Sequence, residues 1–192
     1  GNSGNNYSVT LVADTTGVIT QKALTVGGSF TANNKVYDAT VAATINVNSL
    51  TLVGVVGGDT VTLSPVVEFA DKHVGTGKTV SLTGASSLGG ADSGNYTLSL
   101  TGAPTATANI TAAPLTITAQ TNTKVYDGGI TAAAIPLVVG LQGSDTVTGL
   151  AETYDNKNAG TGKTLSVSSY TINDGNSGNN YSVTLVADTT GV

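Results

Sequence analysis

The chain has no cysteine, methionine, tryptophan or arginine, and its aromatic residues are two phenylalanines and seven tyrosines. Without cysteine a disulfide scaffold and thiolate metal sites are excluded. All seven basic residues are lysines, against twelve acidic residues, so the net charge is −5. This sequence offers no basic patch to neutralise phosphates, which argues against nucleic-acid binding and against attachment to an anionic membrane surface. No apolar run reaches the roughly 18 residues of a spanning helix, so membrane insertion of this segment is not expected.

Glycine, threonine, serine and asparagine are abundant, and the apolar residues are mostly valine, leucine, alanine and isoleucine. Threonine and valine favour strands, whereas glycine and asparagine favour turns. Good helix formers such as glutamate are scarce. The composition therefore predicts an all-β protein, and a length of 192 residues allows one or two domains.

The first eighteen residues return at the end of the chain. Residues 1–18 read GNSGNNYSVTLVADTTGV, and residues 175–192 read the same, an offset of 175 − 1 = 174 residues. We therefore expect the sequence to be one period, plus an overlap, of a longer repetitive protein. Residues 1–18 are then expected to be loosely ordered or paired with an exposed sheet edge on a neighbouring molecule.

A shorter period lies inside the long one. Four motifs recur in the same order, and the offsets between their copies are 89, 86, 85 and 85 residues: Lys35 to Lys124, Asp59 to Asp145, Lys78 to Lys163, and Tyr96 to Tyr181. A period of this length suits a string of small autonomous domains. We predict a C-terminal strand segment of a preceding repeat at residues 1–19, a first domain at 20–111 and a second at 112–192. Equivalent positions in the two domains are expected to have like surroundings.

Apolar and polar residues alternate through both units, for example at Leu24 and Val26 and again at Leu115 and Ile117. Period-two alternation indicates strands with one buried face. About six to eight short strands per unit predict two small immunoglobulin-like β-sandwich domains in an elongated array. If one or two helical turns follow Asp38 or Asp127, with the aspartate as N-cap, β-grasp-like units with one short helix become the alternative.

The recurring motifs resemble the YDG-type repeat of large bacterial surface adhesins, a relative of the MBG repeats. In the first unit they stand as residues 35–38, KVYD, residues 58–61, GDTV, residues 71–78, DKHVGTGK, and residues 92–96, DSGNY. The second unit has Asp127 followed by Gly128, but it departs from the pattern at residues 156–159, NKNA, and lacks a glycine before Asp145. The resemblance implies a stalk or array domain of a long exported protein, and it implies no known catalytic residues.

The most regular candidate positions are those of the repeated motif. They are Lys35, Tyr37, Asp38 and Asp59 in the first unit, and Lys124, Tyr126, Asp127 and Asp145 in the second. We expect a structural role, in which the tyrosine packs its ring and bonds its hydroxyl to backbone while the aspartate caps a turn. The alternative is a ligand contact repeated in every unit.

Other motifs suggest chemistry more weakly. Residues 75–79, GTGKT, lack the earlier glycine of a phosphate loop and precede an alternating strand, so a glycine hairpin is expected. The single histidine, His73, is expected to be a loop residue. Calcium, which takes about six to eight oxygen ligands, has weak candidates in two polar loops: Asp92, Asn95, Asp174 and Asn176. We otherwise expect no cofactor.

The expected function is a structural spacer or stalk repeat of an extended bacterial cell-surface or extracellular-matrix adhesin fibre, with self-association as an option. The expected partners are neighbouring repeats of the same chain and other copies of the same protein. The alternative is a weak multivalent module that binds a glycan or a host surface. We expect an extracellular location and no enzymatic activity.

Overall fold

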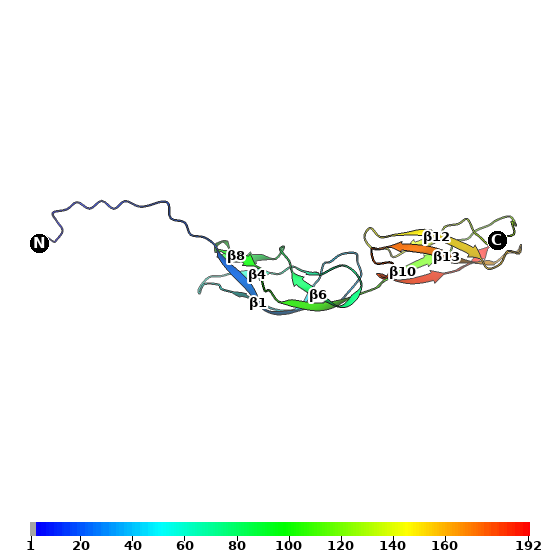
Figure 1. Ribbon diagram of the computed structural model, residues 1–192, viewed down its shortest axis with the longest axis horizontal. Helices are drawn as coiled ribbons and strands as arrows, with labels where there is room; N and C mark the ends of the chain where they lie inside the picture. The colour runs from blue at the N-terminus through cyan, green and yellow to red at the C-terminus, as the bar shows by residue number, and fades with distance from the viewer. Residues whose placement is uncertain (1–2) are drawn as a thin grey trace.

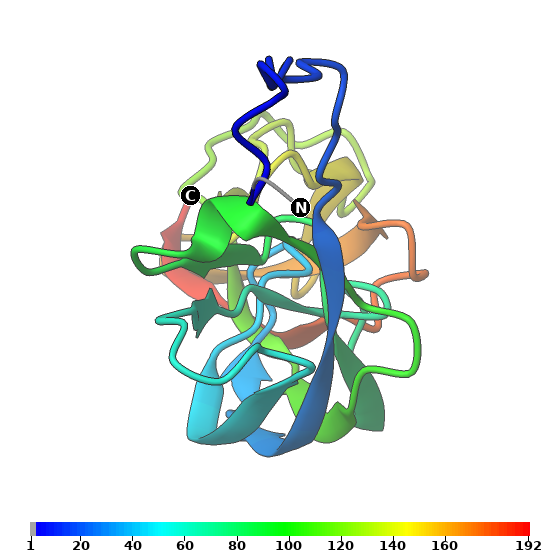
Figure 2. The ribbon, with the colours of Figure 1, turned by 90° about the vertical axis from the view of Figure 1, so that its left-hand side faces the viewer.

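The computed structural model describes residues 3–192, which form two all-β domains in a row behind a long N-terminal segment (Figure 1). The all-β prediction is confirmed. Seen along the long axis, the domains lie one behind the other (Figure 2). Residues 7–21 form no strand within the described chain and are exposed. Of the predicted strand segment 1–19, residues 1–2 lie outside the described residues.

The first domain is built from nine strands and a single 3-10 turn, η1 (Ser93–Asn95). The strands are β1 (Lys22–Ala32), β2 (Lys35–Val36), β3 (Ile45–Val53), β4 (Thr62–Ser64), β5 (Val67–Phe69), β6 (Gly75–Leu82), β7 (Ser87–Gly89), β8 (Tyr96–Ser99) and β9 (Thr105–Thr111).

The second domain is built from six strands. They are β10 (Ala113–Thr118), β11 (Leu137–Val139), β12 (Thr146–Tyr154), β13 (Lys163–Asn173), β14 (Tyr181–Val186) and β15 (Asp188–Gly191). Strand β9 ends and β10 begins on either side of Ala112, so a single residue separates the two domains.

Both domains pair their first strand with a late strand in parallel. The sheet orders are β3-β1-β8, β2-β9-β6-β5 and β4-β7 in the first domain, and β11-β10-β14 and β12-β13-β15 in the second. Strand β1 runs parallel to β8, and β10 runs parallel to β14. Each domain is therefore a small sandwich-like unit closed by strands from opposite ends of its sequence.

The strand numbers differ because the first domain interrupts strands that are continuous in the second. Strand β12 spans the region that the first domain divides into β4 and β5, with Pro65 between them. Proline cannot donate a ladder hydrogen bond, so it interrupts the strand. At the matching position Leu150 lies in a bulge, and strand β12 continues through it. Strand β13 likewise spans the region of β6 and β7. The prediction of six to eight strands per unit fits the second domain, which has six, but not the first, which has nine.

The alternative prediction, a short helix after Asp38 or Asp127, is wrong. Ala39 and Gly128, the next residues, have φ values of 64° and 78°, and a left-handed residue at this point stops a right-handed helix from starting. Asp38 instead accepts a hydrogen bond from the Thr40 amide at 2.9 Å, which closes a local turn. Within residues 3–192 no helix is long and apolar enough to cross a membrane.

The larger hydrophobic core does not stop at the domain boundary. It joins Phe30, Tyr37 and Ile110 of the first domain to Leu115 and Tyr181 of the second. A smaller core lies deeper in the second domain, around the buried residues Ala119, Tyr154 and Leu165. The two domains thus share apolar packing where they meet, which distinguishes the junction from a flexible linker.

Candidate functional site

The most elaborate polar arrangement of the described residues lies at the junction, around the buried carboxylate of Asp145. The Tyr37 hydroxyl donates to its Oδ2 atom at 2.9 Å, and the Tyr181 hydroxyl donates to the same atom at 2.7 Å. The two rings meet edge to face, with centroids 5.5 Å apart. Tyr37 follows β2 of the first domain, whereas Asp145 precedes β12, so this carboxylate joins the two domains.

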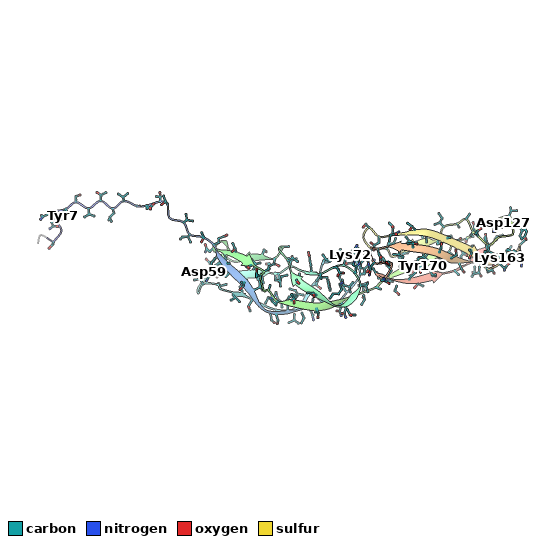
Figure 3. The ribbon with its side chains drawn as sticks, viewed as in Figure 1. Tyr7, Asp59, Lys72, Asp127, Lys163 and Tyr170 are labelled. Carbon is teal, nitrogen blue, oxygen red and sulfur yellow. The ribbon has the colours of Figure 1, made fainter. Side chains whose placement is uncertain are left out.

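The chemistry of this cluster keeps the tyrosines protonated. Burial raises the pKa of Tyr181 to about 12, with the hydrogen bond to Asp145 adding to the effect. Burial and the same carboxylate raise the pKa of Tyr37 still further. A buried carboxylate requires donors to offset its lost hydration. The two hydroxyls supply them, and the Lys72 ammonium lies 4.0 Å from Oδ1 (Figure 3 labels Lys72 at the junction).

A second set of contacts crosses the junction through Asn180, which is fully buried. Its Oδ1 accepts a hydrogen bond from the Val74 amide at 3.0 Å, and its Nδ2 lies 3.2 Å from Nδ1 of His73. The histidine predicted as a loop residue therefore lies in a loop that contacts the neighbouring domain. Sequence reasoning gave His73, Val74 and Asn180 no part in a site, although the recurring pair at residues 180–181 was a signal.

Asp174 organises the loop that carries Asn180. Its carboxylate accepts hydrogen bonds from the backbone amides of Asn176 at 2.7 Å, Gly178 at 2.9 Å and Asn180 at 3.1 Å. Burial on its own raises the pKa of Asp174, but these amides outweigh it and hold the pKa below its usual value. The carboxylate is committed to shaping the loop.

Two of the predicted calcium residues thus fall in this loop, and the other two fall at the far end of the first domain. There the Asp92 carboxylate accepts a hydrogen bond from the Thr60 amide at 2.8 Å. The structure does not bring Asp92 and Asp174 together into one site. Residues 3–192 hold no group of three or more histidine, cysteine, aspartate or glutamate side chains placed to bind a metal.

The junction also brings two backbones close together. A Cβ atom at Gly143 would lie 2.7 Å from the Cβ of Ala39, and Gly143 has a φ of 56°. Both facts favour glycine here, since any side chain would collide with the first domain and would strain the turn. The glycine therefore sets how closely the domains approach.

The repeated lysine and aspartate form the same clamp in both domains. Lys35 Nζ lies 2.7 Å from Asp38 and also donates to the carbonyls of Thr40 and Ala42. Lys124 Nζ lies 2.9 Å from Asp127 and donates to the carbonyls of Gly129 and Thr131. Each ammonium also stands 5.5 Å from an aromatic ring, that of Phe69 or Tyr154.

This clamp fits the expected structural role of the motif, because it ties a turn to its own domain. The repeated tyrosine does something else. Tyr37 bonds to the carboxylate of the next domain rather than to backbone, and only 1% of it is exposed, whereas 62% of Tyr126 is exposed. Like surroundings were expected for Tyr37 and Tyr126 as well and are not found, although the clamps beside them are alike. The reason is that the cover over Tyr37 comes from the second domain.

The hydrogen bonds of Tyr181 at the junction have counterparts at the start of the first domain. At the start of the first domain, the Tyr96 hydroxyl donates to Asp59 at 2.5 Å and accepts from the Val56 amide at 3.0 Å. The hydroxyl of Tyr181 makes the same two contacts, with Asp145 and with the Gln142 amide at 2.8 Å. Asp59 and Asp127 lie at opposite ends of the two-domain unit (Figure 3).

The glycine-rich segment at residues 75–79 has a structural role and lacks the geometry of a phosphate loop. The Gly77 amide donates to Oδ1 of Asn109 at 2.8 Å, and Lys78 Nζ contacts Asp71 at 2.6 Å. The residues that follow continue as strand β6, so no helix N-terminus faces the glycines.

A family model described as the YDG domain matches residues 20–107 and again residues 111–191. No curated protein and no solved structure matches the chain.

Proposed function

Because the chain belongs to the YDG domain family, with one domain in each half, we propose that it is a structural spacer repeat. It serves in the stalk of an extended bacterial cell-surface or extracellular-matrix adhesin fibre. In this role the protein is extracellular, non-catalytic, and active through its length and stiffness. Its partners are neighbouring repeats and other copies of the same protein.

One observation carries the proposal, namely the junction itself. A spacer must transmit its length from one domain to the next, and a flexible linker would lose that length by bending. Here one residue separates β9 from β10, and the buried Asp145 holds a tyrosine from each domain. Shared apolar core and a buried charge-assisted pair resist bending in every direction, because each would have to be exposed or broken.

The test compares two equivalent aspartates. Small-angle X-ray scattering on the wild-type chain is expected to give a single extended particle. Asp145→Ala should broaden the distribution of overall lengths, because it removes the acceptor shared by Tyr37 and Tyr181. Asp59→Ala is the matched control, since the Asp59 carboxylate accepts its hydrogen bond from Tyr96 of its own domain. A wild-type chain that already bends freely at residue 112 would contradict the spacer role.

A second candidate function rests on an open groove of about 800 Å³ in the second domain. Its lining includes Tyr170, Asn173 and Asn179, and Tyr170 is partly exposed. An exposed aromatic ring can stack on a sugar, and amide side chains beside it can form hydrogen bonds with the sugar hydroxyls. Weak multivalent binding of a glycan or a host surface is therefore the alternative. Saturable binding on a glycan array that Tyr170→Ala abolishes would favour it.

A further inference from the structure

Ala39, in the turn that follows Tyr37, holds a backbone conformation that suits glycine better than alanine. Its φ is 64°, and the matching residue of the second domain, Gly128, has a φ of 78°. At such values the Cβ atom of an alanine crowds the backbone, whereas glycine has no Cβ atom to crowd. A strained residue persists where the surrounding structure holds it, so Ala39 is expected to make a contact that offsets the strain.

That contact crosses the boundary between the two domains. A Cβ atom on Gly143 would stand 2.7 Å from the Cβ atom of Ala39. Ala39 is partly buried against the larger core, although its chain neighbours Asp38 and Thr40 are exposed. Its methyl group therefore occupies the space in which a side chain of the second domain would otherwise lie.

The turn that carries Gly143 differs from its copy in the first domain. Each turn is closed by an amide-to-carbonyl hydrogen bond of 3.1 Å, across residues 56–59 in the first domain and across residues 142–145 in the second. The left-handed residue is the third of the four in the first domain, Gly58 with a φ of 98°, but the second of the four in the second domain, Gly143 with a φ of 56°. These positions are characteristic of a type II and a type II′ turn, respectively.

A single residue explains the change of turn. Ser144 stands where the first domain has Gly58, and a type II turn would require a positive φ at that position, which serine disfavours. The type II′ turn moves the positive φ to Gly143 instead. Ala39 and Ser144 thus each replace a glycine of the repeated motif, and they belong to the two turns that meet at the junction.

We propose that Ala39 determines which domain surface the end of the first domain accepts. Its methyl group fills the space that Gly143 leaves open, and Ser144 keeps Gly143 in place by favouring the type II′ turn. Gly128, at the matching place in the second domain, has no methyl group, and the first domain's copy of the opposing turn is of type II. The two domains are therefore not interchangeable in this contact. The inference rests on the proposed spacer role, because this junction is what makes the spacer stiff.

A double-mutant cycle tests this size match. In the wild-type background Gly143→Ala forces two Cβ atoms to 2.7 Å and also strains the turn, whereas in the Ala39→Gly background only the strain remains. We expect Gly143→Ala to raise the equilibrium constant of unfolding about tenfold more in the wild-type background than in the Ala39→Gly background. Urea denaturation followed by circular dichroism measures the four chains. An equal effect of Gly143→Ala in both backgrounds would overturn the proposal.

Gly102→Ala is the control for backbone strain alone. Gly102 has a φ of 71°, and no atom outside its chain neighbours lies within 4 Å of the place that its Cβ atom would take. This change should raise the unfolding constant about fivefold to thirtyfold, as expected of a left-handed alanine. Gly143→Ala in the Ala39→Gly background should have a similar effect. If Gly143→Ala has no larger effect than Gly102→Ala in the wild-type background as well, the Ala39 methyl group has room to spare and the size match is wrong.

Ala39→Gly on its own distinguishes a methyl group that holds the junction from one that does not. The change is the reverse of Gly102→Ala, so a methyl group without a role would give the full gain in stability that relief of the strain provides. A methyl group that holds the junction gives a smaller gain, because its packing is lost, and a broader distribution of overall lengths in small-angle X-ray scattering. The full gain together with an unchanged length distribution would overturn the proposal.

Failure of this proposal can be told apart from failure of the spacer role. If Asp145→Ala broadens the length distribution and Ala39→Gly does not, the junction is stiff without the methyl group. The role assigned to Ala39 is then wrong, and the spacer role stands. A wild-type chain that bends freely at residue 112 and shows no coupling between Ala39 and Gly143 in the cycle would overturn both.

Discussion

Tyr37 and Tyr126 are the same residue of the same repeated motif, and yet one is 1% exposed and the other 62%. The lysine and aspartate beside them form equal clamps in both domains, so the motif itself is not what differs. What differs is that the second domain packs on Tyr37. The comparison teaches that in this chain each domain completes the lysine–aspartate turn by itself, whereas the tyrosine between them is buried only where another domain packs on it.

The two cores differ in a second way. Val67 packs in the first core, whereas its counterpart in the second domain is Glu152, which is 1% exposed. The glutamate Oε2 accepts a hydrogen bond from the Gln120 amide at 2.8 Å, and its Oε1 has no hydrogen-bond partner. Strand β10 has ended by residue 120, whereas β1 still pairs with β3 at the equivalent Ser29. The carboxylate thus replaces a ladder acceptor that the shorter sheet lacks.

The largest expected effect comes from truncating the two tyrosines. Tyr37→Ala should lower the free energy of unfolding by about 3–5 kcal/mol, because it empties a buried aromatic site and leaves Asp145 with one donor fewer. Tyr126→Ala should change it by no more than about 0.5 kcal/mol, as expected of an exposed residue. Chemical denaturation followed by circular dichroism measures both. Equal losses in the two variants would show that the motif acts within its own domain.

The next effect concerns the buried glutamate. Glu152→Ala should destabilise the second domain by about 1–3 kcal/mol, because the Gln120 amide is then left without its acceptor. Glu152→Gln is the matched control, since the amide oxygen can still accept that hydrogen bond. The unfolding midpoint of the second domain is the quantity to compare. If the alanine variant is as stable as the wild type, the amide has another partner in solution.

Alkaline pH should weaken the junction. The pKa values of Tyr37 and Tyr181 are raised in the folded chain, for Tyr181 to about 12. The folded state therefore keeps protons that the unfolded chain releases, and stability is complete below about pH 10 and falls as pH rises toward 12. The slope is about 1.4 kcal/mol per pH unit for each such tyrosine. Denaturation across this range should show a shallower slope for Tyr181→Phe, whereas Tyr170→Phe should behave as wild type.

The smallest expected effect is that of calcium. The oxygens of Asp174 accept three backbone hydrogen bonds, and Asp92 accepts one in the other loop. A calcium ion would have to compete with these bonds for the carboxylate oxygens. The melting temperature should therefore stay the same with excess calcium and with a chelator. A rise with calcium that Asp174→Asn removes, but Asp92→Asn does not, would locate an ion site in the junction loop.

Much of this architecture could be predicted from the chain alone. Alternation at Leu24 and Val26, and at Leu115 and Ile117, predicted strands because a pleated strand sends successive side chains to opposite faces. The recurring motifs predicted two similar units, since a repeated sequence meets the same local forces twice. The lysine–aspartate clamps belong to this class, because both partners lie within three residues of each other.

Other features depended on residues far apart in the sequence. The bond from Tyr37 to Asp145 spans 108 residues, and that from Val74 to Asn180 spans 106. No local pattern distinguishes a tyrosine whose partner lies in the next domain from one that faces solvent. The strand break at Pro65 could be predicted from proline chemistry. The role of Glu152 as an acceptor for the Gln120 amide could not, because it depends on where a neighbouring strand ends.

By itself, the sequence determined the all-β class, the repeat and its short-range clamps, because these follow from period, propensity and nearest neighbours. Only the tertiary structure decided which copy of the tyrosine is buried and which aspartate joins two domains. The physical reason is that a side chain on the surface of one domain becomes buried only where the surface of another domain packs against it. Two copies of one motif become unequal when another domain packs on one of them, as the second domain does on Tyr37.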